Sequence, residues 1–192
     1  MRKTMMTILG VAILILVATA PATLLTSAQE KPKPEVFQAQ AYGTSTQLGK
    51  NFNVTIRIEE YSTAEDQQIL LKAFQSAGME GLSNALSKMS TKGRLAITGT
   101  LGYDVSYIRN FRTEDGRKIR LITNRPINFG EQWWDGRSTD YSLSLVELNL
   151  SDVKGKSTGT LLPACKFKIN KEKEIEVEAF QNPWKLTEIL QR

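Results

Sequence analysis

The sequence predicts a mostly β fold of the α+β class: an antiparallel meander that forms a barrel or a sandwich, with a two-helix insertion after the second strand. Short stretches in which apolar and polar residues alternate recur from residue 36 to the end of the chain, separated by turn residues. Such alternation indicates strands with one buried face. The apolar spacing becomes helical only over residues 63–90. Because the strands are short and their connections tight, sequential neighbours are expected to pair antiparallel.

Residues 1–28 have the layout of a secretory signal peptide. Two cations precede an apolar run, Pro21 ends that run, and small residues lead up to a cleavage point after Ala28. The alternative is an uncleaved membrane anchor, since the apolar stretch is close to the roughly 20 residues that span a bilayer. A linker rich in Lys and Pro, 29–35, leads into a single β-rich domain, 36–192. We therefore expect an exported protein, either periplasmic or extracellular.

The first two strands are predicted at 36–42 and 52–59, where apolar residues occupy every second position. Helical spacing follows them. Ser62 and Glu65 stand three residues apart, as in a capping box, and Gly78 can take the left-handed conformation that ends a helix. The sequence thus predicts one helix before Gly78 and a second, shorter one after it. The methionines of the second helix are expected in the core, because they share a helical face with leucines.

The rest of the chain returns to alternation. Six further strands are predicted, at 94–98, 103–113, 117–123, 141–150, 159–169 and 174–180. A last segment, 184–190, fits either a strand or one helical turn. In the hairpin formed by the last two of the six strands, Ile169 is expected to face Ile175. The same pairing would bury Cys165 as a structural thiol.

Residues 113–116 predict the turn of an earlier hairpin, with Gly116 in a one-residue bulge. This turn would place Phe111 opposite Ile119 and would gather the apolar side chains on one face, as hydrophobic patterning favours. Arg109 would then lie on that apolar face. A guanidinium buried there needs an anion, which is either the carboxylate of a structural ion pair or a bound ligand.

The opposite face of the same hairpin is predicted to carry a basic surface patch of Arg112, Lys118 and Arg120. Arg112 and Lys118 would form a like-charged cross-strand pair, which costs up to about 1 kcal/mol. Such a patch is either a solvated outer face or a contact surface for an anionic partner, including a weak electrostatic contact with membrane headgroups.

Residues 124–140 form the longest stretch after the helices without clear periodicity, and long connections are often functional. Adjacent tryptophans point to opposite sides of an extended chain, so one can plug the barrel while the other is displayed for stacking on a ligand or partner. Glu131 and Asp135 could instead form the acid–base pair of a glycoside hydrolase. The candidate ligand-binding residues of this segment are Arg125, Trp133, Trp134, Asp135 and Arg137.

The composition excludes several kinds of chemistry. The chain of 192 residues has no histidine and one cysteine. It therefore offers no Ser-His-Asp or Cys-His catalysis, no imidazole metal site and no internal disulfide. We predict neither a metal nor a cofactor. The formal net charge of +5 falls further if the signal peptide is removed, and it is too low to indicate nucleic acid as a partner.

Two segments, 119–127 (IRLITNRPI) and 136–148 (GRSTDYSLSLVEL), together with the helical pair before them, are similar to a family of exported bacterial proteins of unknown function. The resemblance implies a signal peptide, one β-rich domain and a bacterial envelope or secreted setting, without indicating a substrate. The predicted topology is also similar to that of lipocalin-like and plant-allergen-like ligand carriers, although the long C-terminal helix of the latter is missing. A likeness of topology alone is weak support for function.

These features predict an exported, non-enzymatic binding module for an apolar or anionic small molecule, with Arg109 and residues 124–140 as its site. Two alternatives stay open. One is a protein–protein interaction domain of the cell envelope, which a large exposed apolar patch would favour. The other is a carbohydrate-active enzyme centred on Glu131 and Asp135. A solidly packed core, with Arg109 neutralised by a carboxylate, would count against the ligand site inside the barrel.

Overall fold

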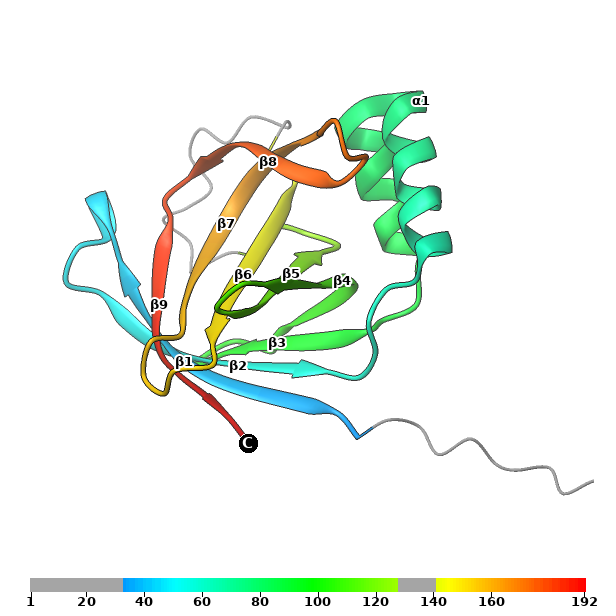
Figure 1. Cartoon of the computed structure of the whole chain (residues 1–192). Coiled ribbons are helices and arrows are strands. Elements are labelled where there is room, and N and C mark those ends of the chain that lie inside the picture. Colours follow the sequence, from blue (N-terminus) through cyan, green and yellow to red (C-terminus); the bar gives the residue numbers. More distant parts are fainter. Residues whose placement is uncertain (1–32, 128–140) are drawn as a thin grey trace, which may run out of the picture. The chain divides into compact units, whose positions relative to one another are not determined.

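Alternating side chains build the strands of a closed β barrel (Figure 1). The computed structural model describes residues 33–127 and 141–192, within a compact unit that spans Pro32–Arg192. The elements are β1 (Glu35–Gly43), η1 (Ser45–Gln47), β2 (Asn51–Ile58), α1 (Ala64–Lys88), β3 (Gly93–Ile97), β4 (Tyr103–Thr113), β5 (Gly116–Thr123), β6 (Leu143–Ser151), β7 (Thr158–Ile169), β8 (Ile175–Gln181) and β9 (Trp184–Gln191).

The strands follow the predicted antiparallel meander. Each strand predicted from the alternation is present, with its ends within two residues of those expected, and the last segment is a strand, β9. Eight strands close the barrel in the order β6-β5-β4-β3-β2-β1-β9-β7, and β7 pairs again with β6. Strand β7 pairs with β6 along one edge. Along its opposite edge it pairs first with β9, at Gly159–Leu161, and then with β8, at Ala164–Ile169. The choice between barrel and sandwich is therefore settled in favour of the barrel.

The barrel interior is a packed hydrophobic core. Trp184, which is 2% exposed, fills one end together with Phe52, and the centroids of the two rings lie 4.6 Å apart. Every strand of the barrel contributes at least one fully buried side chain, as in Phe37, Val54, Leu95, Ile108, Leu121, Val146, Leu161 and Leu186. Burial of these side chains is the main term that stabilises the fold.

A second core lies on the outside of the barrel, beneath α1, which covers one side of it in Figure 1. The helix contributes Leu70, Leu71, Leu82 and Leu86, and the strands contribute Tyr107, Ile122, Leu143, Leu145, Leu162, Cys165, Phe167 and Ile175. Met79 and Met89 pack against this outer core, as the sequence predicted. Several strands are consequently apolar on both faces.

The structure has one helix where two were predicted. The dihedral angles of Ala77 and Gly78 are non-helical, and Gly78 has a φ of 57°, so a kink at the predicted break separates two helical halves within the single element α1. The capping box lies one residue later than expected. Thr63 accepts a hydrogen bond from the backbone N–H of Asp66, and the Asp66 carboxylate accepts one from the backbone N–H of Thr63.

The register of the β4–β5 hairpin also differs from the prediction. Phe111 lies opposite Lys118 and not opposite Ile119, and Arg112 lies opposite Arg117. The shift of one residue moves Arg112 and Lys118 to opposite faces of the sheet, because side chains alternate along a strand. The predicted basic patch is therefore not a single surface.

The register differs from the prediction because the outer core buries the second face of the hairpin as well. The prediction assumed that apolar side chains gather on one face of the hairpin. In the structure Ile108 and Leu121 face the barrel interior, whereas Tyr107 and Ile122 pack beneath α1. When both faces are buried, hydrophobic patterning no longer selects one register.

The β7–β8 hairpin begins in the predicted register, with Ile169 opposite Ile175. A register shift between Phe167 and Lys166 then places Cys165 opposite Phe180. The Cys165 thiol is buried, as expected, and this burial raises its pKa. A thiol in such surroundings is inert, which agrees with the structural role predicted for it.

Candidate binding site at the barrel mouth

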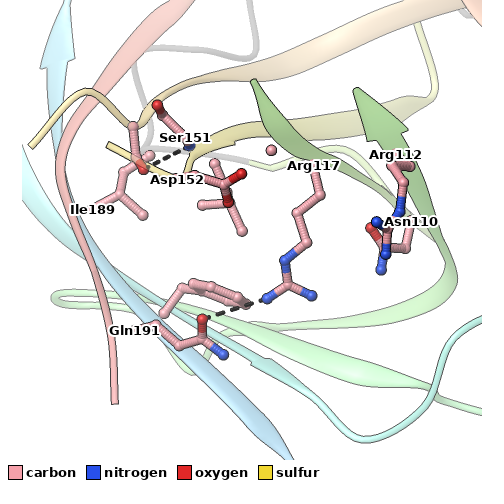
Figure 2. Close-up of a pocket in the computed structure, with 11 residues that line it drawn as sticks. Asn110, Arg112, Arg117, Ser151, Asp152, Ile189 and Gln191 are labelled. Carbon is pink, nitrogen blue, oxygen red and sulfur yellow. Dashed lines mark hydrogen bonds between the residues drawn. The ribbon is translucent and has the colours of Figure 1, made fainter. Parts of the chain in front are cut away.

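The end of the barrel opposite Trp184 holds a cavity of about 570 Å³, which we refer to as the barrel mouth. It lies among the first residues of β1, the β4–β5 hairpin, and the last residues of β6 and β9. Its polar lining includes Asn110, Arg112, Arg117, Ser151, Asp152 and Gln191, and its apolar lining consists of Phe37, Leu150 and Ile189 (Figure 2). The volume lies within the range of roughly 300–1,000 Å³ that is usual for small-molecule sites.

Two arginines of the hairpin line the mouth. Arg112 and Arg117 are paired directly across β4 and β5, so their side chains lie on the same face of the sheet. Figure 2 shows Arg117 extending toward Gln191, while Arg112 lies beside Asn110 on the neighbouring strand. Arg112 is exposed and makes no hydrogen bond or ion pair with any residue that the structure describes. It is a cation placed opposite another cation.

Arg117, by contrast, is held by several partners. Its Nη2 donates to Oε2 of Glu35 at 2.5 Å, and its Nη1 donates to the hydroxyl oxygen of Tyr61 at 3.3 Å. Nη2 also lies 3.4 Å from the side-chain oxygen of Gln191. The guanidinium carbon lies 5.7 Å from the ring centroid of Phe37, which is close enough for a cation–π contact.

The Glu35 carboxylate receives two further hydrogen bonds. The Tyr61 hydroxyl donates to Oε1 at 2.6 Å, and the Gln191 amide donates to Oε2 at 3.1 Å. Burial would raise the pKa of Glu35, but the hydrogen bonds from Arg117, Tyr61 and Gln191 outweigh it and hold the pKa below its usual value. Glu35 is thus ionised at neutral pH and neutralises Arg117. Among the described residues, Arg112 has no such counterion.

A second cavity, of about 660 Å³, lies beside the mouth, around the β4–β5 turn. It shares Arg117, Leu150, Ser151 and Asp152 with the mouth. Asp152 is exposed, so its charge is well screened by water. The two cavities together make the rim of the barrel a polar surface, whereas its floor, at Phe37 and Leu150, is apolar.

The structure places Arg109 away from the mouth. Its side chain lies on the outer side of β4, where Nη2 is 2.9 Å from Oε1 of Glu174. This is the structural ion pair that the sequence left as one of two options. Lys118 and Arg120 also lie on the outer side and share the Glu147 carboxylate, at 3.1 Å and 2.9 Å respectively. These three cations therefore form ion pairs on the outer side of the barrel.

Arg125 is exposed and donates a hydrogen bond to the carbonyl oxygen of Gly102 at 3.2 Å. Its guanidinium carbon lies 5.0 Å from the ring centroid of Tyr103. The other candidates of the 124–140 segment, Glu131, Trp133, Trp134, Asp135 and Arg137, lie outside the described residues, as do the predicted signal peptide, 1–28, and most of the predicted linker.

Sequence reasoning missed most of the mouth. Of the residues that line the mouth, the sequence indicates only Arg112, and it predicts that residue on the outer face of the hairpin. Glu35, Tyr61, Arg117 and Gln191 come from four separate segments, and nothing in their spacing indicates that they meet. One local signal exists. Arg112 lies on the same side of β4 as the buried Ile108, and Arg117 lies on the same side of β5 as the buried Ile119, which indicates two arginines at the end of the interior face. This signal can be recognised only when the register of the hairpin is known.

Within residues 33–127 and 141–192, no cluster of acidic and cysteine side chains is arranged to hold a metal ion. In the same ranges no helix is long and apolar enough to cross a membrane. No family model, curated protein or solved structure matches the chain. The resemblance to an exported bacterial family therefore stays a prediction, and function has to be inferred from the geometry of this chain alone.

Proposed function

We propose that this chain is an exported, non-enzymatic binding module, and that its barrel mouth takes a small molecule with an anionic head and an apolar body. The observation that carries the proposal is the position of Arg112. An exposed guanidinium without a counterion among the described residues stands at a cavity of about 570 Å³ whose floor is apolar. An anion bound there would relieve the repulsion between Arg112 and Arg117.

The apolar lining supports the second half of the proposal. Phe37 is 1% exposed and is the last layer of the interior core, so the cavity is a cup with a closed floor. Leu150 and Ile189 also line the cavity and are only half-buried. A ligand that covered these side chains would gain free energy in proportion to the apolar area removed from water.

The charges at the mouth suit binding better than acid–base catalysis. A general acid that works near neutral pH needs a pKa raised toward 7. The pKa of Glu35 is shifted in the opposite direction, because Arg117 and its other donors stabilise the carboxylate. Glu35 is therefore a fixed negative charge at neutral pH, and its partner Arg117 is a fixed positive charge.

The test uses the full chain and two fluorescent probes, dansyl-labelled undecanoic acid and its methyl ester, which differ in the charge of the head. We expect saturable binding of both. Arg112→Gln should weaken binding of the acid about three- to tenfold, the scale of one screened charge pair, and leave the ester unchanged. Arg94→Gln is the matched control, because Arg94 is half exposed and pairs with Asp104 at 2.7 Å outside the mouth. Equal effects of the two substitutions, or no saturable binding, would overturn the proposal.

A protein–protein interaction domain is a second candidate, and one observation favours it. Among the described strands β8 pairs only with β7, and Phe180 on β8 is 52% exposed. A free strand edge can accept a strand from another chain. Light scattering of the purified chain tests this: a stable dimer that Phe180→Lys dissociates would support the candidate, and a monomer would count against self-association. The carbohydrate-active enzyme rests on Glu131 and Asp135 and stays a prediction.

A further inference from the structure

The groups around Glu35 form a ready-made recognition site for a carboxylate. Arg117 offers two N–H groups, at 2.5 and 3.4 Å from the two oxygens, Tyr61 offers its hydroxyl at 2.6 Å, and Gln191 its amide at 3.1 Å. A planar guanidinium with added hydroxyl and amide donors matches the geometry of a carboxylate rather than that of a neutral group. In this structure the protein's own carboxylate occupies the site.

This donor set borders the barrel mouth. Arg117 and Gln191 are lining residues of the cavity, and the side chains of Glu35 and Arg117 are 25% and 29% exposed. A ligand that enters the mouth with a negative head would therefore meet Arg117 with Glu35 already bound to it. Glu35 is the first residue of β1, so it stands at a strand end, and its side chain is partly exposed.

We propose that Glu35 is a built-in competitor for the ligand of the mouth, and that this ligand is an amphiphile whose head is a single carboxylate. The head exchanges with Glu35 at Arg117, while Arg112 on the facing strand supplies a second cation. This inference rests on the proposed function, since it names the chemistry and the regulation of the same site. In the exchange one carboxylate replaces another, so the number of hydrogen bonds and the charge at Arg117 are conserved.

The exchange predicts how affinity depends on charge. In the wild type a carboxylate ligand must displace Glu35, whereas a neutral ligand need not. Glu35→Gln keeps the size of the side chain and removes its charge, which leaves Arg117 without a counterion. We expect this substitution to tighten binding of dansyl-labelled undecanoic acid about tenfold and to leave binding of its methyl ester unchanged. Glu178→Gln is the matched control, because Glu178 pairs with Lys166 on the outside of the sheet.

A second substitution separates exchange from simple repulsion. If the ligand carboxylate takes the place of Glu35, it gains the hydrogen bond of the Tyr61 hydroxyl. Tyr61→Phe added to Glu35→Gln should then weaken binding of the acid again, by about threefold, which is the scale of one hydrogen bond. If Glu35 acted only by long-range repulsion, removal of a neutral hydroxyl would leave the tightened binding as it was.

The outcomes separate the two proposals. Equal affinities of Glu35→Gln and Glu178→Gln for the acid would overturn the competitor role, and so would a gain that Tyr61→Phe does not reduce. Absence of binding of both probes to the wild type and to every variant would overturn the proposed function itself. Thermal unfolding verifies that each variant is folded, and Glu35→Ala, which also removes the charge, replaces Glu35→Gln if the latter does not fold.

Discussion

Lys92 is a buried lysine that ties the start of α1 to the barrel. Its side chain is 6% exposed, and its ammonium lies 2.8 Å from Glu60 and 3.1 Å from Asp66. Asp66 is also the capping-box residue of α1. Lys92→Met keeps the length of the side chain but removes its charge, so Asp66 would be left without this counterion at the point where the helix begins.

Two opposing effects determine how much Lys92→Met lowers the free energy of unfolding. Burial lowers the pKa of Lys92, but its bonds to Glu60 and Asp66 raise it by more, so the carboxylates more than offset the desolvation of the ammonium. Glu60 is 54% exposed and its contribution is screened by water, whereas Asp66 is 19% exposed. Most of the loss therefore comes from Asp66, and we expect Lys92→Met to lower the free energy of unfolding by about 2 kcal/mol.

Urea unfolding followed by circular dichroism at neutral pH measures this change. Asp66→Asn retains an oxygen for the cap but not the charge, so a double-mutant cycle with Lys92→Met isolates the pair, and we expect a coupling of about 1 kcal/mol. The Lys92 contribution is complete below its ordinary pKa of 10.5 and is lost as pH rises through the higher pKa of the folded state. A change under about 0.5 kcal/mol, or strictly additive effects, would refute the reasoning.

Two further predictions concern the two ends of the barrel. Trp184→Ala should lower the free energy of unfolding by about 3–5 kcal/mol in guanidinium denaturation, because it empties the packed closed end; nearly unchanged stability would contradict a packed interior. At the mouth, the lowered pKa of Glu35 means that its contribution to stability is present above the ordinary value of 4.5 and fades as pH falls below it. The difference in Tm between the wild type and Glu35→Gln should therefore shrink from about pH 6 to pH 3, and a constant difference would contradict the ion pair.

The strands were predictable because each has at least one face in the barrel core. That burial imposes a period of two on the sequence, which can be read without knowing the partners of a strand, as in the alternating apolar residues of β2. Closure into a barrel was left open with a sandwich, because closure depends on the pairing of β6 with β7 and of β1 with β9. The pairing of β1 with β9 joins segments far apart in the chain, so no local pattern indicates it.

The sequence did not locate the candidate site at the barrel mouth. It predicted an anion site built from arginines at Arg109 and in the 124–140 segment, most of which lies outside the described residues. Arg109 instead pairs with Glu174 on the outer side, and the cation that lines the barrel mouth without a counterion among the described residues is Arg112. The predicted and observed positions of these arginines differ because the β4–β5 register is shifted by one residue. The hydrophobic pattern could not distinguish the two registers, because α1 buries the outer face of the same hairpin.

The amino-acid sequence by itself determined the order and the ends of the strands, the kink at Gly78 and the buried, structural role of Cys165. These are properties of short segments, and local periodicity and backbone preference are enough to specify them. Only the tertiary structure decided the closure of the barrel, the register of β4 against β5 and the meeting of Glu35, Tyr61, Arg117 and Gln191. Those features depend on contacts between distant segments, whose free energies arise only once the barrel is closed.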